Sequence, residues 1–194
     1  MVTAVSQIVA LPNRVPKSEF VAGRLCLAFC NTVALPDAAD RFDHAAGLAA
    51  WALRAGYPLD GVPGPADFDA CITLRSELRA IFEALADGKP PPQAALDWLS
   101  GINLPPRLVW DKVAGRARPI AAGGRLDRLR QALVADAVDL LTGTAQARIK
   151  RCPAHDCRWF FFDTSRNGTR RWCAMADCGV KDKVRRFRRK QPAF

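Results

Sequence analysis

The chain has 194 residues, 49% of them hydrophobic, and a formal net charge of +10. This length exceeds one typical domain and falls short of two, so we expect a main domain with a small appendage. Because the sequence has no run of about 18 apolar residues and no signal-peptide pattern at its N-terminus, we expect a cytoplasmic protein that does not span a membrane.

The positive charge is concentrated at one end of the chain. Residues 1–147 contain 15 basic and 15 acidic side chains, whereas residues 148–194 contain 14 basic and 4 acidic ones. All the excess charge therefore lies in the last quarter. This asymmetry indicates a basic module on a neutral body and favours a polyanionic partner such as nucleic acid.

The neutral part is predicted to be mainly helical. Residues 1–17, with two prolines and weak periodicity, are predicted to be a flexible lead-in to a domain over 18–147. Apolar residues at spacings of three and four predict helices, and "DKVAGR" between two strand-like stretches predicts a β-hairpin. These elements are helices over about 21–32 (whose start could equally be a strand), 43–55, 65–87, from 92 and 125–141, and the hairpin over 106–120.

Four cysteines in the basic part have matched spacing. "CPAHDC" and "CAMADC" each hold two cysteines separated by four residues, and fifteen residues lie between the pairs. Zinc in structural sites prefers four such ligands in a tetrahedron, so we predict one zinc ion per chain. With four thiolates the coordination shell is closed, which makes the site structural rather than catalytic and leaves His155 outside it. The predicted ligands are Cys152, Cys157, Cys173 and Cys178.

The rest of the basic part predicts a small module over 148–194. "RWFFFDTSRNGTRRW" reads as strand, turn and strand because Asn-Gly is a strong hairpin signal. The residues after Gly179 suit a cationic helix, on which Val180, Val184 and Phe187 form one apolar edge. The fold class expected is therefore α+β: a helical domain with a β-hairpin, followed by a treble-clef-like zinc module of knuckle, β-hairpin and basic helix.

These residues carry a family resemblance. Residues 151–190 resemble the CGNR zinc finger in the paired cysteines, the "F-x-D-x-S-R-N" segment and the "R-R-W-C" segment. The stretch "GRLCLAFCNT" at 23–32 is similar to a signature of the ABATE domain, which usually precedes this finger. The resemblance implies a stress-induced transcription regulator.

The chain departs from the family at the motif that names the finger. It has "CGVK", with Val180 and Lys181 where the family has Asn and Arg. All four predicted zinc ligands are kept. Lysine keeps the positive charge but lacks arginine's bidentate fork, so we expect a base-specific contact there to be weakened.

From these features we predict a zinc-dependent, DNA-binding transcription regulator that is not an enzyme. Its N-terminal domain would sense a small-molecule ligand or mediate homodimerisation, and Arg24 and Asn31 are equally suited to lining a ligand pocket or to bonding backbone groups. A zinc-stabilised RNA-binding or protein-interaction module is the alternative. The partner expected is nucleic acid in the form of duplex DNA. The residues predicted to contact it are Arg166, Arg170, Arg171, Lys181, Lys183, Arg185, Arg186, Arg188 and Arg189.

Overall fold

The structure is a computed structural model, and it describes residues 20–33, 40–102, 107–120 and 123–190. The predicted lead-in over 1–17 lies outside these residues. Of the described helices, none is long and apolar enough to cross a membrane. The secondary structure is mixed, as the sequence predicts, with helices in the N-terminal part and two small antiparallel hairpins.

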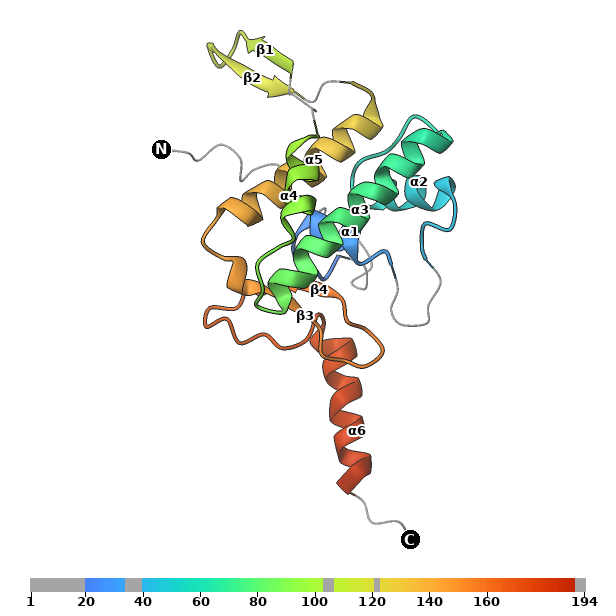
Figure 1. The fold of residues 1–194 in the computed structure, drawn as a ribbon, viewed down its shortest axis with the longest axis vertical. Coiled ribbons are helices and arrows are strands. Elements are labelled where there is room, and N and C mark those ends of the chain that lie inside the picture. Colours follow the sequence, from blue (N-terminus) through green and yellow to red (C-terminus); the bar gives the residue numbers. More distant parts are fainter. Residues whose placement is uncertain (1–19, 34–39, 103–106, 121–122, 191–194) are drawn as a thin grey trace.

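A short buried helix forms the centre of the N-terminal part. Every residue of α1 (Leu25–Cys30) is buried, and the helix lies between α3 (Pro65–Ala86) and α5 (Arg125–Thr142) (Figure 1). A helix that is apolar on all sides is stable only inside a core. The two smaller helices, α2 (Ala45–Arg54) and α4 (Gln93–Ser100), add Trp51 and Leu99 to the same hydrophobic core.

The longest helix follows its predicted pattern. In α3 the residues at spacings of three and four face the core, and the helix begins with Pro65 in the first turn, where a missing N–H costs nothing. It ends before Gly88, which has a φ of +70° that favours glycine. The buried apolar residues of this stripe are Cys71, Leu74, Leu78, Ile81 and Phe82.

The first hairpin projects away from the helices. Strands β1 (Arg107–Asp111) and β2 (Arg116–Ile120) pair in the predicted region, and Figure 1 shows them at one end of the molecule. Leu108 and Trp110 on β1 are both exposed.

The second hairpin joins the two parts of the chain. After the single turn η1 (Gln146–Arg148), strand β3 (Ile149–Arg151) pairs with β4 (Phe160–Phe162). Phe160 packs into the N-terminal core, whereas Phe161 packs into a second hydrophobic cluster around the four cysteines. Successive side chains of a strand point to opposite faces, so a strand buried on both faces is apolar throughout. This explains the run of three phenylalanines.

The predicted partner of this strand was wrong. The sequence favoured pairing of residues 159–162 with the segment after Asn167-Gly168, but β4 pairs with β3, and residues 163–174 form turns and irregular backbone. The cause lies in Asp163, whose carboxylate accepts the backbone N–H groups of Ser165 and Arg170. These bonds fold the segment around one side chain instead of extending it into a strand.

Candidate metal centre and basic helix

The four predicted ligands lie together. The sulfur atoms of Cys152, Cys157, Cys173 and Cys178 are all within 4.8 Å of one another. The Sγ of Cys173 is 3.4 Å from that of Cys157 and 3.6 Å from that of Cys178. Four sulfurs at the usual Zn–S distance of about 2.3 Å would be separated by about 3.8 Å in a tetrahedron. The donor set and its spacing therefore fit one zinc ion.

The electrostatics of the cluster also fit a cation. Hydrogen bonds from its neighbours lower the pKa of Cys152 to about 2, whereas the hydrogen bond to Cys152 raises the pKa of Cys173. Burial, followed by the charge of Cys157, raises the pKa of Cys178 to about 12. Four thiolates this close together repel one another unless a cation lies between them. A zinc ion would compensate this repulsion and hold four thiolates in a closed shell, which serves folding.

Two aromatic residues and a glycine complete the metal centre. Trp159 and Trp172 pack against the cysteine cluster. Cys178 lies in the π-helical turn η2 (Met175–Gly179). A Cβ at Gly179 would lie 2.4 Å from the Met175 sulfur and 3.2 Å from a ring carbon of Trp172, so the glycine allows close packing here.

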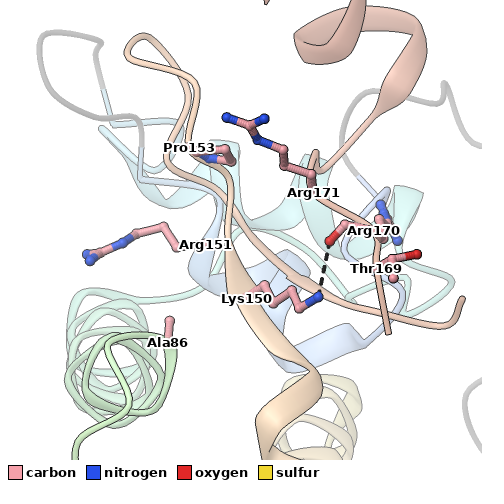
Figure 2. A pocket seen from close by; sticks show the side chains of 7 residues that line it. All are labelled: Ala86, Lys150, Arg151, Pro153, Thr169, Arg170 and Arg171. Atoms are coloured by element: carbon pink, nitrogen blue, oxygen red, sulfur yellow. Dashed lines mark hydrogen bonds between the residues drawn. The ribbon is translucent and has the colours of Figure 1, made fainter. Parts of the chain in front are cut away.

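A shallow basic pocket lies where the end of α3 meets the finger. Its volume is about 470 Å³, and Figure 2 shows the side chains that line it. The ammonium group of Lys150 donates to the carboxylate of Asp163 and to two backbone carbonyls, so all three of its hydrogens have acceptors. Arg151 pairs with Asp87 at the end of α3. Of the pocket's four cationic side chains, Arg171 is the exposed one.

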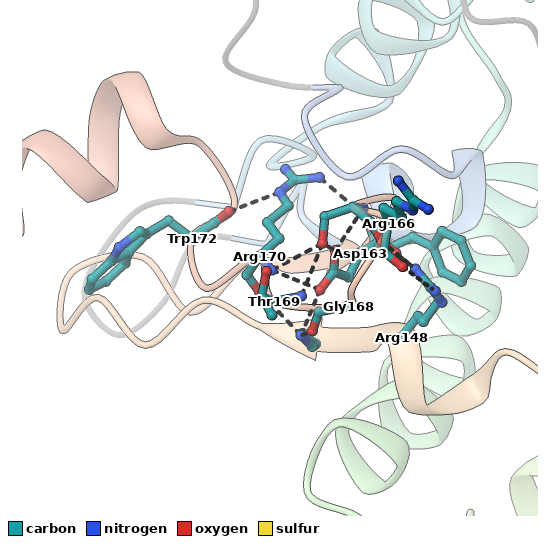
Figure 3. A network of polar contacts seen from close by, with 10 residues as sticks. Arg148, Asp163, Arg166, Gly168, Thr169, Arg170 and Trp172 are labelled. Atoms are coloured by element: carbon teal, nitrogen blue, oxygen red, sulfur yellow. Dashed lines mark hydrogen bonds and ion pairs between the residues drawn. The ribbon is translucent and has the colours of Figure 1, made fainter.

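Asp163 organises the loop between the two cysteine pairs (Figure 3). Its fully buried carboxylate forms an ion pair with Lys150 at 2.6 Å and accepts the Ser165 hydroxyl at 2.6 Å. Burial alone would raise the pKa of this carboxyl group, but the bonds from Lys150 and Ser165 outweigh it and lower the pKa. Arg148 closes the network by donating to the carbonyls of Asp163 and Ser165. Lys150 and Arg148 were not predicted, because only the fold brings them close to their acceptors, which are the Asp163 carboxylate for Lys150 and backbone carbonyls for both.

Arg170 has a different role from the one predicted. Its guanidinium donates to the carbonyls of Trp172 at 3.0 Å and Val21 at 2.8 Å, and it lies 4.6 Å from the ring centroid of Phe161. The side chain thus connects the finger to the N-terminal part. With its donors directed inward, we leave Arg170 out of the proposed nucleic-acid interface.

The predicted cationic helix is present. α6 (Val180–Lys190) follows η2 directly, and Figure 1 shows it extending away from the rest of the molecule. Lys181 pairs with Asp156 and Asp177, and the Asp177 carboxylate raises its pKa. Arg185 and Arg186 both pair with Asp182. The other described cationic side chains of α6, and two in the preceding loop, are exposed without an ion pair to a described residue: Lys183, Arg188, Arg189, Arg166 and Arg171.

The two residues proposed for a ligand pocket bond within the protein instead. Arg24 forms ion pairs with Asp136 at 2.7 Å and with Asp139 at 2.6 Å, which fixes the start of α1 to α5. The buried Asn31 side chain exchanges two hydrogen bonds of 2.8 Å with the backbone of Phe160. Of the two interpretations, the structure therefore supports internal bonding for both residues.

Removal of the Asn31 amide should weaken the junction between the two parts. We expect Asn31→Ala to lower the free energy of unfolding by about 2 kcal/mol, because it leaves buried N–H and C=O groups of Phe160 without these partners. Urea unfolding followed by tryptophan fluorescence measures the change. Asn167→Ala, the same substitution at an exposed position, should change stability by less than about 0.5 kcal/mol. Equal effects of the two substitutions would contradict this role for Asn31.

The structure places the protein in the class of helical domains that carry a four-cysteine zinc module with a projecting basic helix. Two family models match the chain. The CGNR zinc finger matches residues 148–191, and ABATE, described as "Putative stress-induced transcription regulator", matches residues 23–144. The chain belongs to the ABATE family and carries a CGNR zinc finger after the ABATE domain. A search of curated proteins found no match.

The two residues that depart from the family motif, Val180 and Lys181, both lie outside the metal centre. Val180 begins α6 and is exposed, and Lys181 is held by two carboxylates of the finger. Neither residue belongs to the cysteine cluster, so the substitutions leave the zinc ligands intact.

Proposed function

We propose that the protein is a transcription regulator that binds duplex DNA through α6. The observation that carries the proposal is the charge of this helix, which has seven basic residues and one acidic residue among eleven and projects from the body (Figure 1). Cationic side chains on an exposed helix displace counterions from phosphates, which drives association with nucleic acid. The zinc module supports the start of this helix, since Cys178 lies in the turn η2 that directly precedes it.

The N-terminal domain supports the proposal by its attachment to the finger. Arg79 of α3 donates to the Cys30 carbonyl at 2.9 Å and lies 5.5 Å from the ring centroid of Phe160. Arg41 lies 5.6 Å from the ring centroid of Trp159. Such contacts would hold α6 in a defined direction. Ligand sensing, homodimerisation and the absence of catalysis stay predictions.

The salt dependence of binding tests the proposal. We expect the affinity for a labelled duplex to fall with salt, at a slope of log K against log salt near −5 if about six phosphates are contacted. The double variant Arg188→Ala/Arg189→Ala should make this slope less steep by about 2, because each lost phosphate contact removes about 0.9. Fluorescence anisotropy at several salt concentrations measures both values.

A matched control separates α6 from general charge. Arg116→Ala/Arg118→Ala removes the same charge from the exposed strand β2 and should leave the slope unchanged. An equal loss in both double variants would show that net charge alone causes the binding. No binding to any duplex at low salt would refute the proposed function, and preference for a structured RNA at fixed salt would favour the alternative of an RNA-binding module.

A further inference from the structure

The basic helix carries an apolar stripe with no core to cover it. Val180, Val184 and Phe187 lie at positions i, i+4 and i+7 of α6, on one side of the helix. Val184 is 43% exposed and Phe187 is 64% exposed. Neither belongs to the two hydrophobic clusters of the described residues. An aromatic side chain left in water on a folded protein suits a contact with a partner.

Cationic side chains border this stripe on both sides. A shallow depression of about 340 Å³ is lined by Val184 and Phe187 together with Lys183 and Arg188. Both cations are exposed, and neither forms an ion pair with a described residue. The surface therefore offers a narrow apolar contact between two positive charges.

The charge of α6 selects among partners for this stripe. A second copy of the chain would bring two helices together that each carry seven basic residues, and like charges at such distances repel. A groove of duplex DNA presents phosphates along both edges, which match the bordering cations, and base edges on its floor. In the major groove, the thymine methyl is the apolar group on those edges.

The dimensions of the helix suit this groove. Eleven residues at about 1.5 Å each give a length of roughly 16 Å, and the major groove, about 12 Å wide, admits one α-helix. Figure 1 shows α6 extending away from the rest of the molecule, so the N-terminal helices do not surround it.

We propose that the Val184–Phe187 edge of α6 contacts thymine methyl groups in the major groove, with Lys183 and Arg188 on the phosphates at its two sides. This inference rests on the proposed function and adds a preference for thymine to a contact that is otherwise electrostatic. In this arrangement Phe187 provides the larger apolar surface.

Replacement of thymine by uracil, which lacks the methyl group, tests the contact directly. The two probes are a labelled duplex of alternating A and T and the same duplex with every thymine replaced by uracil. The unaltered protein should bind the uracil duplex about fivefold more weakly, as expected for the loss of about one buried methyl group. Phe187→Ala should bind the thymine duplex more weakly and should no longer distinguish the two.

The control variant is Leu108→Ala, which removes an equally exposed apolar side chain, 68% exposed, from the distant strand β1. It should keep the fivefold preference. Circular dichroism of Phe187→Ala should match that of the unaltered protein, because the side chain packs in neither hydrophobic cluster.

Three other outcomes would each overturn the inference. Equal affinity of the unaltered protein for both duplexes, with the expected salt slope, would leave the proposed function standing without the methyl contact. A fivefold preference that persists in Phe187→Ala would place the contact elsewhere. Phe187-dependent binding to phosphatidylserine vesicles, with equal affinity for the two duplexes, would identify an anionic membrane surface as the partner. Failure to bind either duplex at low salt would instead refute the proposed function itself.

Discussion

Cys173→Ala should lose its zinc and lower the melting temperature of the whole chain. Zinc in four-cysteine modules contributes an apparent binding free energy of about 10–16 kcal/mol, which becomes folding free energy. The other three cysteines of the cluster each offer one ligand atom already, so none of them can replace the buried Cys173 sulfur. We expect zinc content to fall from about one per chain to near zero.

The effect should extend beyond the finger, because β3 and β4 contribute Ile149 and Phe160 to the N-terminal core. Elemental analysis and thermal unfolding by circular dichroism measure the two losses. Cys71→Ala, at a buried cysteine of α3 outside the metal centre, should keep its zinc. A Cys173→Ala protein with full zinc content, or with an unchanged melting temperature, would refute the assignment of the ligand.

Asp163→Ala should destabilise the protein by about 3 kcal/mol, because it removes a fully buried, charged acceptor of hydrogen bonds from the protein interior. Besides Lys150, the carboxylate binds the backbone N–H groups of Ser165 and Arg170, which determine the course of the loop toward Cys173. Urea unfolding of zinc-loaded protein measures the change.

An exposed carboxylate in the same finger provides the comparison. Asp156→Ala removes only the 3.6 Å contact with Lys181 and should cost less than about 1 kcal/mol. If the two substitutions proved equally mild, Asp163 would not organise the loop.

The sequence predicted those features that depend on local pattern. The stripe of α3 and the glycine after it define a helix over 65–87, and the structure has Pro65–Ala86. The matched spacing of four cysteines likewise predicted the metal centre. In both cases the signal lies in residues close together in the chain, where periodicity and ligand chemistry are direct guides.

Features that depend on distant partners could not be predicted in this way. Strand β3 has three residues, too few for a pattern, so the Asn-Gly turn suggested the wrong partner for β4. Arg170 stands in a basic run, yet its acceptors include the Val21 carbonyl, which is 149 positions away in the chain. The sequence shows that a residue is charged, but it does not show whether the charged group faces solvent or an acceptor inside the protein.

The hairpin that is buried on both faces limits how this zinc finger can be transplanted. Phe161 packs around the metal centre, whereas Phe160 and Ile149 pack in the core of the helical domain. If residues 148–191 were excised alone, Phe160 and Ile149 would be exposed to water. Excision would also break the two hydrogen bonds between the Asn31 side chain and the backbone of Phe160. A chimaera that grafts this finger onto another protein therefore has to carry α1 and α3 along with it, and the unit of exchange is the whole chain rather than its last quarter.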